Sequence, residues 1–510
     1  MRCSGTIPFI VILALFVAGC RGDVDRASAL AANLRQMTGG KPIVPVQDAV
    51  WKDVHAFYEQ RQGAAAWVDE KSTERAAQVL AVLRTAARHG LAAEKYGEPQ
   101  IVERIEALKS SKDDAPGRLQ QIAELDARLT TSLLGFGRDV AIGRTPPAPF
   151  RKSRREAPDL AGTLAQSAGG DPEKWVEAIR PRHPEYAALQ DALVKLQGQR
   201  EKGGWSAVPS AKSGSGRARP TIVALRQRLA AGGHLSAAAA SNTSARYTSD
   251  DETAVRAFQA LHALSATGVA DPATLSAMNV PIDDRIRQVE LNLERWRWMP
   301  DDFGAQHLFV NIPYFHLVAR ENGKAVKDIR VVVGKPANKT PIFSSDMATV
   351  VFSPYWNIPD SIVEGETAPA VARDPAYLAK NDWDDAEQLK HLAFRQRPGP
   401  GNALGRVKFL FPNEFDVYLH DTPSDDLFAR PGRAFSHGCV RVEEPEALAK
   451  YILRGDQDWD DARILEAMQS GVETHVRLKA AIPVHIVYFT AWVDDNGGLH
   501  FQPDVYGYDT

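Results

Sequence analysis

Two kinds of hydrophobic spacing divide the chain. From about residue 40 to residue 200, apolar positions recur every three or four residues, as in the stretches 73–89 and 119–136, and this spacing predicts helices. Beyond residue 305, short segments alternate apolar and polar positions and are rich in β-branched and aromatic residues, which predicts strands. We therefore expect a multidomain α+β protein with a helical first part and a mostly β final domain.

The middle of the chain predicts a linker followed by a small helical module. Residues 201–220, EKGGWSAVPSAKSGSGRARP, are dominated by Gly, Ser and basic residues, as in a flexible linker or a long exposed loop. Residues 220–282 contain three short helical patterns, the last with Asp271 as its cap and Pro272 at its first position. A heptad-like pattern over 283–300 then predicts a connecting helix that packs on its neighbours.

The final domain, 305–510, contains one long interruption. Between residues 359 and 405 the strand pattern gives way to Pro, Gly and charged residues, which predicts a lid or cap over about 360–403. Near the end of the chain, DDNGG at 494–498 predicts a hairpin turn between two strands.

The N-terminus resembles an export signal. An apolar run follows Arg2 and ends in VAGC at Cys20, the pattern of a bacterial lipoprotein signal peptide over residues 1–20. Lipidation of Cys20 would attach the exported protein to a membrane in the periplasm. Cleavage without lipidation is the alternative, and both predict export. Arg21, where aspartate would favour inner-membrane retention, slightly favours the outer membrane.

Composition and charge exclude some classes of function. The chain has 510 residues, of which 44% are hydrophobic, enough for two to four domains. Its formal net charge of -3 and pI near 6.5 give no basic excess, so we expect no nucleic-acid partner. The sequence also has no clustered His, Asp and Glu motif of the zinc-hydrolase kind, so we expect no metal.

Cys439 is the one cysteine that stays available as a thiol. Cys3 leaves with the signal and Cys20 is acylated, so Cys439 has no disulfide partner. A lone thiol in an oxidising compartment is either a buried hydrophobe or a reactive group, and its surroundings, AFSHGCVRVEEP, favour the second. A thiol with a pKa of about 8.5 needs a base. His420, at the end of a predicted strand, and His437 are both candidates.

Gly438 and Ser436 are candidates for supporting this chemistry. Gly438 allows a sharp turn, after which the amides of Gly438 and Cys439 can point at one oxygen, as an oxyanion hole requires. Ser436 is expected to hydrogen-bond His420 or, alternatively, to satisfy its own turn.

Arg441 is a candidate for binding a substrate carboxylate by paired hydrogen bonds. The alternative is a salt bridge with Glu443 or Glu444. The segment 444–454, EPEALAKYILR, predicts a helix that begins with Pro445 and packs behind the site.

Several of these motifs together resemble one family. His420, fifteen intervening residues and the run SHGCVR resemble the signature of the L,D-transpeptidases, cysteine enzymes of bacterial cell-wall assembly. FSPYWNIPDSI at 352–362 and RQRPGPGNALGRVKF at 395–409 resemble the large Gram-negative form of this family. That form joins a helical scaffold domain, here 40–200, to a peptidoglycan-binding module and a capped catalytic domain. Residues of the three-helix module that resemble the peptidoglycan-binding type are Phe258, Gln259, Thr267, Gly268, Asp271, Thr274 and Leu275. They are also the packing and turn residues of any small helical domain.

The resemblance implies roles for individual residues. It implies Cys439 as the nucleophile, His420 as its base, and backbone amides near His437, Gly438 and Cys439 as the oxyanion hole. Substrate contacts are implied for Trp356, Asn402 and Arg441, although Trp356 is alternatively a core residue. Asp421 follows His420 where many relatives have glycine, so what orients the imidazole stays open.

The resemblance also implies an activity. The expected reaction forms 3-3 cross-links between donor and acceptor stem peptides of peptidoglycan through a thioester, with release of D-alanine and no cofactor. Hydrolysis of the same thioester, as an L,D-carboxypeptidase, and anchoring of a protein to the wall are alternatives. A catalytically inert wall-binding scaffold lipoprotein is an alternative of another class. The sequence does not identify any protein partner, so protein partners stay open.

Overall fold

The computed structural model of the protein describes residues 13–112, 115–144, 146–153, 155–167, 171–209, 219–359, 362–374, 376–380 and 395–510. Two compact units divide these residues: one falls within 1–145, 155–194 and 296–299, and the other within 146–154, 195–295 and 300–510. The predicted signal sequence up to residue 12 and the side chain of Cys20 lie outside the described part.

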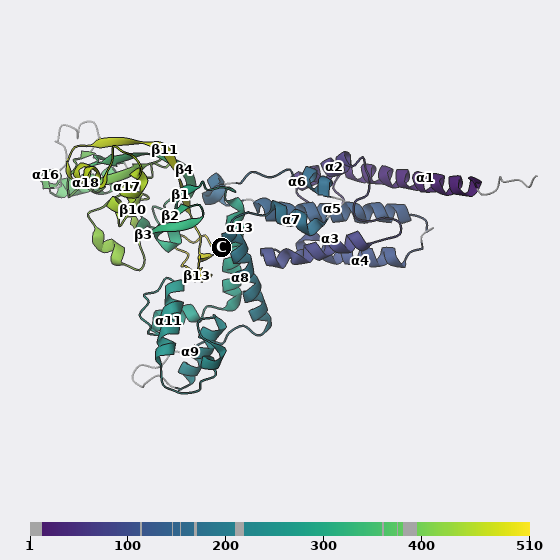
Figure 1. Cartoon of the computed structure of the whole chain (residues 1–510), viewed down its shortest axis with the longest axis horizontal. Coiled ribbons are helices and arrows are strands. Elements are labelled where there is room, and N and C mark those ends of the chain that lie inside the picture. Colours follow the sequence, from purple (N-terminus) through teal and green to yellow (C-terminus); the bar gives the residue numbers. More distant parts are fainter. Residues whose placement is uncertain are drawn as a thin grey trace, which may run out of the picture. The chain divides into compact units, whose positions relative to one another are not determined.

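The first unit is helical, as its hydrophobic spacing predicts (Figure 1). Its core surrounds the long helix α5, whose Leu129, Leu133 and Phe136 are fully buried. Leu30 and Leu34 of α1 join this core, so the helical unit begins before residue 40. The helical elements are α1 (Leu13–Thr38), α2 (Asp48–Gln60), α3 (Glu74–Arg84), η1 (Thr85–His89), η2 (Ala93–Tyr96), α4 (Glu98–Ser110), α5 (Arg118–Ile142), α6 (Leu160–Ser167), α7 (Pro172–Ile179) and, extending into the second unit, α8 (Pro184–Glu201). None of the helices in the described ranges is both long and apolar enough to cross a membrane.

The second unit begins with the small helical module. Its helices are α9 (Arg219–Ala231), α10 (Ala237–Ala240), α11 (Ser249–Leu261) and α12 (Pro272–Met278). Asp271 caps α12 by accepting a hydrogen bond from Thr274 N at 2.7 Å, as predicted. Gln259 is fully buried and accepts from Gly268 N at 2.8 Å, so it fixes the turn between α11 and α12. Helix α13 (Ile282–Trp298) follows.

The predicted linker is not flexible throughout. Trp205 donates to Val280 O at 3.0 Å, and Val208 is buried in the core of the module. The Arg228 guanidinium lies 3.9 Å from the centre of the Trp205 ring. The Gly- and Ser-rich composition of this segment gave no sign that Trp205 and Val208 pack against the module. Residues 210–218 lie outside the described part.

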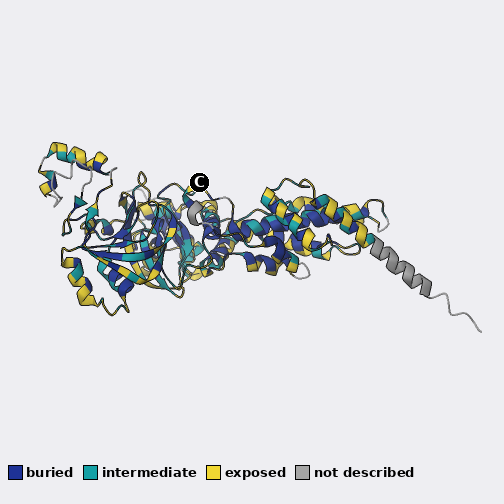
Figure 2. Ribbon diagram, turned by 90° about the horizontal axis from the view of Figure 1, so that it is seen from above, coloured by how far each residue is buried: buried dark blue, intermediate teal, exposed yellow. Residues whose placement is uncertain are grey.

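A nine-stranded sheet forms the centre of the final domain, in the order β10-β8-β7-β4-β11-β1-β2-β3-β9. Strand β10 also pairs with β3, so the sheet closes on itself. Buried residues follow its strands in Figure 2. The strands of this sheet are β1 (Gln306–Asn311), β2 (His316–Glu321), β3 (Lys324–Gly334), β4 (Phe343–Phe352), β7 (Val407–Leu410), β8 (Leu419–His420), β9 (Ala434–Ser436), β10 (Val440–Val442) and β11 (Thr474–Val487).

The remaining elements surround this sheet. β12 (Ala491–Val493) and β13 (Leu499–Phe501) form the predicted hairpin, and the predicted helix after the site is α17 (Pro445–Leu453). Helix α18 (Asp461–Gln469) packs against α17. Short helical turns are η3 (Ala148–Ser153), η4 (Ile312–Tyr314) and η7 (Asp425–Ala429).

The interruption after β4 is partly helical. A two-stranded pair of β5 (Trp356–Asn357) and β6 (Arg395–Gln396) holds its two ends together. Between them lie η5 (Val363–Thr367), α15 (Ala368–Arg373) and α16 (Tyr377–Lys380). Ile358, Val363 and Leu378 form a small core of their own. We call the described residues 362–380 the cap segment.

Candidate active site

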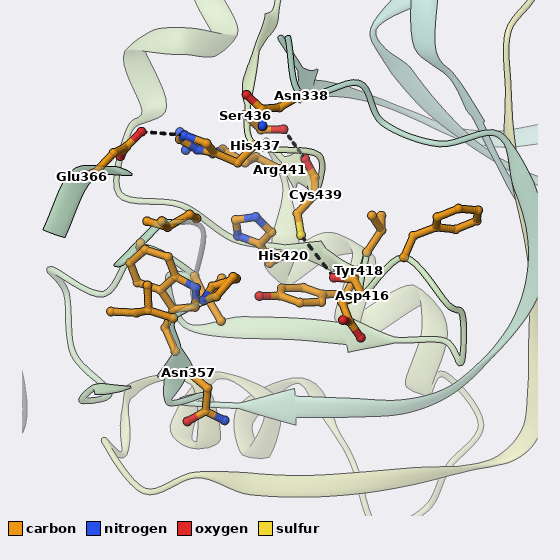
Figure 3. Close-up of a pocket in the computed structure, with 18 of the residues that line it drawn as sticks. Asn338, Asn357, Glu366, Asp416, Tyr418, His420, Ser436, His437, Cys439 and Arg441 are labelled. Atoms are coloured by element: carbon orange, nitrogen blue, oxygen red, sulfur yellow. Dashed lines mark hydrogen bonds and ion pairs between the residues drawn. The ribbon is translucent and has the colours of Figure 1, made fainter. Parts of the chain in front are cut away.

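Two short parallel strands place His420 and Cys439 on one face of the sheet. Strand β8 pairs with β10 so that Leu419 lies opposite Val440 and His420 opposite Arg441. Because side chains alternate between the faces of a sheet, His420 and Arg441 share a face with Cys439, one residue before β10. His420 and Cys439 both line a cavity of about 830 Å³ (Figure 3).

His420 is held as a neutral base. It is 4% exposed, and its Nδ1 donates a hydrogen bond to the backbone carbonyl of Asp421 at 2.5 Å. Since a carbonyl only accepts, the proton sits on Nδ1 and Nε2 is free to accept one. Burial and, secondly, the nearby Arg441 guanidinium lower the pKa of His420 to about 3. The carbonyl of Asp421 thus orients the imidazole where the sequence left this open.

The thiol of Cys439 is also uncharged at rest. Its Sγ donates to the backbone carbonyl of Asp416 at 3.8 Å. Burial raises the pKa of Cys439, while hydrogen bonds to Tyr418 and the charge of Arg441 act in the opposite direction. Burial, and then the closeness of Cys439, raises the pKa of the Tyr418 phenol well above its ordinary value. Tyr418 therefore remains a hydrogen-bond donor to the sulfur.

The Ser436 side chain forms hydrogen bonds within its own turn and not with His420. The prediction of a hydrogen bond between Ser436 and His420 is therefore wrong, and the alternative is confirmed. Its buried hydroxyl donates to the Cys439 carbonyl at 2.5 Å and accepts from Gly438 N at 3.1 Å. Thr340 Oγ1 donates to the Gly438 carbonyl at 2.8 Å. These bonds fix the loop that presents the thiol.

This loop corrects the predicted oxyanion hole. Gly438 adopts a φ of +127°, which favours glycine, but its amide already donates to Ser436. Because an amide has one hydrogen, Gly438 is not free to bind a substrate oxygen. The Cys439 amide makes no hydrogen bond to any residue in the described part, so it is available as a donor.

His437 points away from the thiol, toward the cap segment. Its Nε2 lies 2.7 Å from Glu366 Oε1 and 3.4 Å from Lys335 Nζ. Figure 3 shows the imidazole of His437 directed toward Glu366 and that of His420 next to the sulfur of Cys439. Of the two histidines that the sequence offered as bases, the geometry therefore favours His420.

Arg441 lines the cavity without an ion pair to either predicted glutamate. Glu443 is bound to Arg330, whose Nε donates to it at 2.7 Å, and this excludes Glu443 as the partner. Within the described part, the buried Nε of Arg441 has no hydrogen-bond partner, and no ion pair joins Arg441 to Glu444. A half-buried guanidinium with free donors can bind a carboxylate that enters the cavity.

Of the other two predicted substrate contacts, Asn402 is a loop residue. It is 1% exposed, its side chain donates to Arg397 O at 2.8 Å and accepts from Leu404 N at 2.8 Å, and it does not line the cavity. The prediction that Asn402 contacts the substrate is therefore wrong. The polar atoms of Asn402 are already used in hydrogen bonds that hold the loop after β6. Trp356 lines the cavity and also packs on the core of the cap segment, so both predicted readings of this residue apply.

The sequence analysis did not predict a role for four residues that line the cavity: Tyr418, Asp416, Lys335 and Glu366. Tyr418 precedes His420 by two positions, so strand alternation is a signal that would have found it. Asp416 contributes only its carbonyl, and sequence patterns carry no signal for that. Lys335 and Glu366 meet near His437 through tertiary contacts between distant segments.

Family models match three parts of the chain. Residues 305–464 match the YkuD family, described as "L,D-transpeptidase catalytic domain". Residues 52–193 match a "Scaffold domain", and residues 218–278 match a "Putative peptidoglycan binding domain". The three matched ranges correspond to the sheet domain, the helical unit and the small module described above.

Individual proteins with these names were also found. A curated protein of Haemophilus influenzae, named "Putative L,D-transpeptidase", is 33% identical over 240 residues, which is 44% of this chain and 48% of that protein. The chain thus spans about half the length of this relative. A crystal structure of an L,D-transpeptidase from Stackebrandtia nassauensis is 14% identical and covers 55% of this chain and 96% of that one, with a TM-score of 0.22. An L,D-transpeptidase from Mycobacterium smegmatis is 12% identical over 36% of this chain and 58% of that one, with a TM-score of 0.21.

The domain matches define a multidomain protein with a peptidoglycan-binding domain and a transpeptidase catalytic domain. Residues 305–464 thus form a domain similar to L,D-transpeptidase catalytic domains.

Proposed function

We propose that this chain forms 3-3 cross-links in peptidoglycan by acyl transfer through Cys439. The observation that carries the proposal is a neutral, oriented His420 beside an unpaired thiol in one cavity. The peptidoglycan-binding domain supports the same substrate. The donor is a tetrapeptide stem whose third residue is meso-diaminopimelate and whose last is D-alanine.

In the first step, Cys439 attacks the carbonyl of the diaminopimelate residue. Burial keeps both the thiol and His420 uncharged at neutral pH, so the proton moves to Nε2 of His420 as the sulfur attacks. The S–C bond forms, the C–N bond to D-alanine breaks, and His420 returns the proton to the departing amine. A thioester on Cys439 remains.

Three groups stabilise this step. The amide of Cys439 donates to the developing oxyanion, a contribution of about 3 kcal/mol to the barrier for one such donor. Tyr418 donates to the sulfur. Arg441 binds the carboxylate of the leaving D-alanine with its free donors.

In the second step, the side-chain amine of a second stem attacks the thioester. His420 takes the amine proton, the C–S bond breaks, and the proton returns to Cys439 as the new amide forms. The energy of the cleaved peptide bond is carried by the thioester, so no ATP is consumed. Such a reaction can therefore run outside the cytoplasm.

The test is cross-linking of isolated tetrapeptide stems by wild type, Cys439→Ala and His420→Gln. We expect wild type to produce dimers with 3-3 links and free D-alanine, and both variants to lose at least about a hundredfold in rate. Dimer formation by Cys439→Ala at the wild-type rate would reject the thioester.

The fate of the thioester distinguishes related activities. Muropeptides released from wall incubated with the protein would contain only trimmed monomers for a carboxypeptidase, and a protein linked to the stem for an anchoring enzyme. Either result in place of dimers contradicts cross-linking. A carbapenem adduct on Cys439, seen by mass spectrometry, is expected for all three, and its absence would favour the inert scaffold.

We place this activity in the periplasm, with the chain attached to a membrane through lipidated Cys20. The lipoprotein pattern VAGC and the peptidoglycan-acting domains support this location.

A further inference from the structure

One wall of the cavity carries two opposite charges that flank a histidine. Glu366 Oε1 lies 2.7 Å from Nε2 of His437, and Lys335 Nζ lies 3.4 Å from the same nitrogen. All three residues line the cavity that holds Cys439. Both charged groups therefore border the cavity, and the Glu366 side chain, 56% exposed, is also open to solvent.

The two charges are supported by different parts of the fold. The backbone amide of Lys335 donates to the Ser436 carbonyl at 2.9 Å, which ties the base of this side chain to the loop of the nucleophile. Glu366 lies on the cap segment, in η5. The cation thus comes from a backbone tied to the loop of Cys439, and the anion comes from the cap segment.

His437 does not neutralise these charges. Its Nε2 either donates to Glu366 or accepts from Lys335, because one ring nitrogen cannot do both at once. A carboxylate has about four acceptor sites and an ammonium has three donors, so most of the binding capacity of both groups is unused. No carboxylate of a residue in the described ranges forms an ion pair with Lys335. A cation and an anion with free capacity on one wall are complementary to a ligand that carries both charges.

We propose that Lys335 and Glu366 form a site for a zwitterionic amino-acid head group, with Lys335 on the carboxylate and Glu366 on the ammonium. Resting on the proposed function, this head is the free end of a diaminopimelate side chain, which carries both groups on one carbon. Trp356, Ile358 and Ile362, which line the same cavity, supply apolar surface for its methylene chain. The site makes Lys335 and Glu366 determinants of substrate specificity.

This site distinguishes diaminopimelate from lysine. A lysine side chain ends in an ammonium without a carboxylate, so a lysine stem keeps the contact with Glu366 and loses the contact with Lys335. Lys335, left without a carboxylate partner, discriminates against the incomplete ligand. The head group comes from the donor stem or from the acceptor stem, and the chemistry of the site is the same for both.

The experiment compares diaminopimelate and lysine stems with wild type, Lys335→Met and Glu366→Gln. In the donor arm, D-alanine release is measured without an acceptor. In the acceptor arm, the donor is fixed and the yield of cross-linked dimer is measured. Controls are Lys324→Met on β3 and Glu364→Gln on the cap segment, both exposed side chains outside the cavity.

We expect wild type to prefer diaminopimelate about tenfold or more in kcat/KM in at least one arm. Lys335→Met should bring this ratio close to one in the same arm, Glu366→Gln should slow both substrates there about equally, and the controls should behave as wild type. The arm that responds identifies the source of the head group.

Two results would overturn the site: a wild type that does not distinguish the two stems in either arm, or a Lys335→Met variant that keeps the full preference. The first of these results is obtained with the wild type alone, so it tests the site even if a variant fails to fold. A wild type without D-alanine release or carbapenem adduct would instead reject the proposed function itself.

Discussion

Burial, more than charge, sets the state of the reacting side chains. His420 and Cys439 are both driven toward their neutral forms by desolvation, and the opposing contacts with Asp421, Tyr418 and Arg441 are secondary. A preformed ion pair between thiolate and imidazolium is therefore disfavoured at rest. The hydrogen bonds around the sulfur matter most once negative charge develops on it.

Tyr418→Phe tests the donor to the sulfur. The change removes the phenol hydrogen bond without removing the ring, so the pKa of Cys439 should rise further and acylation should slow about tenfold to a hundredfold. The rate of carbapenem adduct formation on Cys439 measures this. Tyr314→Phe, outside the cavity, is the control, and equal rates for the two variants would contradict the role of Tyr418.

The acid limb of acylation tests the environment of His420. Because the pKa of His420 is about 3 instead of 6.5, the histidine stays unprotonated as the pH falls well below 6.5, and acylation should persist there. Arg441→Gln removes a nearby positive charge, so the pKa of His420 should rise and the loss of activity should begin at higher pH. Burial is the larger cause, so the pKa should remain below 6.5.

The rate of carbapenem adduct formation, measured over a pH series, gives the acid limb of the wild type and of Arg441→Gln. An acid limb that stays unchanged in Arg441→Gln would show that this guanidinium does not act on the imidazole.

At the scale of elements, the nucleophile sits on a strained loop between β9 and β10. The paired strands hold both ends, while Ser436 and Thr340 bind the loop from within and from the side. Gly438 supplies the left-handed backbone that this path needs. The loop geometry, and with it the direction of the Cys439 amide, depends on one residue without a Cβ.

Gly438→Ala separates backbone strain from crowding. A Cβ at this position would meet no atom closer than Lys339 O at 4.0 Å, so its cost comes from the φ of +127°, about 1–3 kcal/mol. We expect at least about a tenfold loss in Cys439 acylation. Gly432→Ala, in the same region, is the matched control, since its Cβ would meet nothing within 4 Å and no left-handed φ is required.

A normal acylation rate for Gly438→Ala would show that the loop tolerates another path.

At the scale of the whole molecule, the chain joins a domain that matches a peptidoglycan-binding model to one that matches a transpeptidase catalytic model. The peptidoglycan-binding domain and the catalytic domain belong to the same compact unit, and His262 of the first stands 5.5 Å from Phe501 of the second, measured between ring centres. The cap segment belongs to this unit as well. The small helical module, the sheet domain and the cap segment therefore lie in one compact unit.

Cys20→Ser tests membrane attachment. Without the thiol, the lipid cannot be added, so the protein should move from the detergent-extracted membrane fraction to the soluble periplasmic fraction. Immunoblots of both fractions measure the change. Finding the wild type in the soluble fraction would contradict the lipoprotein prediction.

The sequence by itself determined the elements and the reacting pair. Periodicity identified the helices before residue 300 and the strands after residue 305, because alternation of buried and exposed positions is a local property. The absence of a second thiol pointed to Cys439, and the resemblance carried by His420 and SHGCVR predicted the roles of base and nucleophile. The small module and its Asp271 cap also followed from local pattern.

Tertiary structure decided the contacts that join distant segments. Thr340 donates to the Gly438 carbonyl, Asn402 donates to the Pro354 carbonyl, and Lys335 and Glu366 both contact His437, although none of these pairings follows from spacing along the chain. A polar side chain is either a substrate contact or a structural one according to whether its hydrogen bonds are already satisfied. Only the folded chain determines that, because the partners come from segments that the sequence keeps apart.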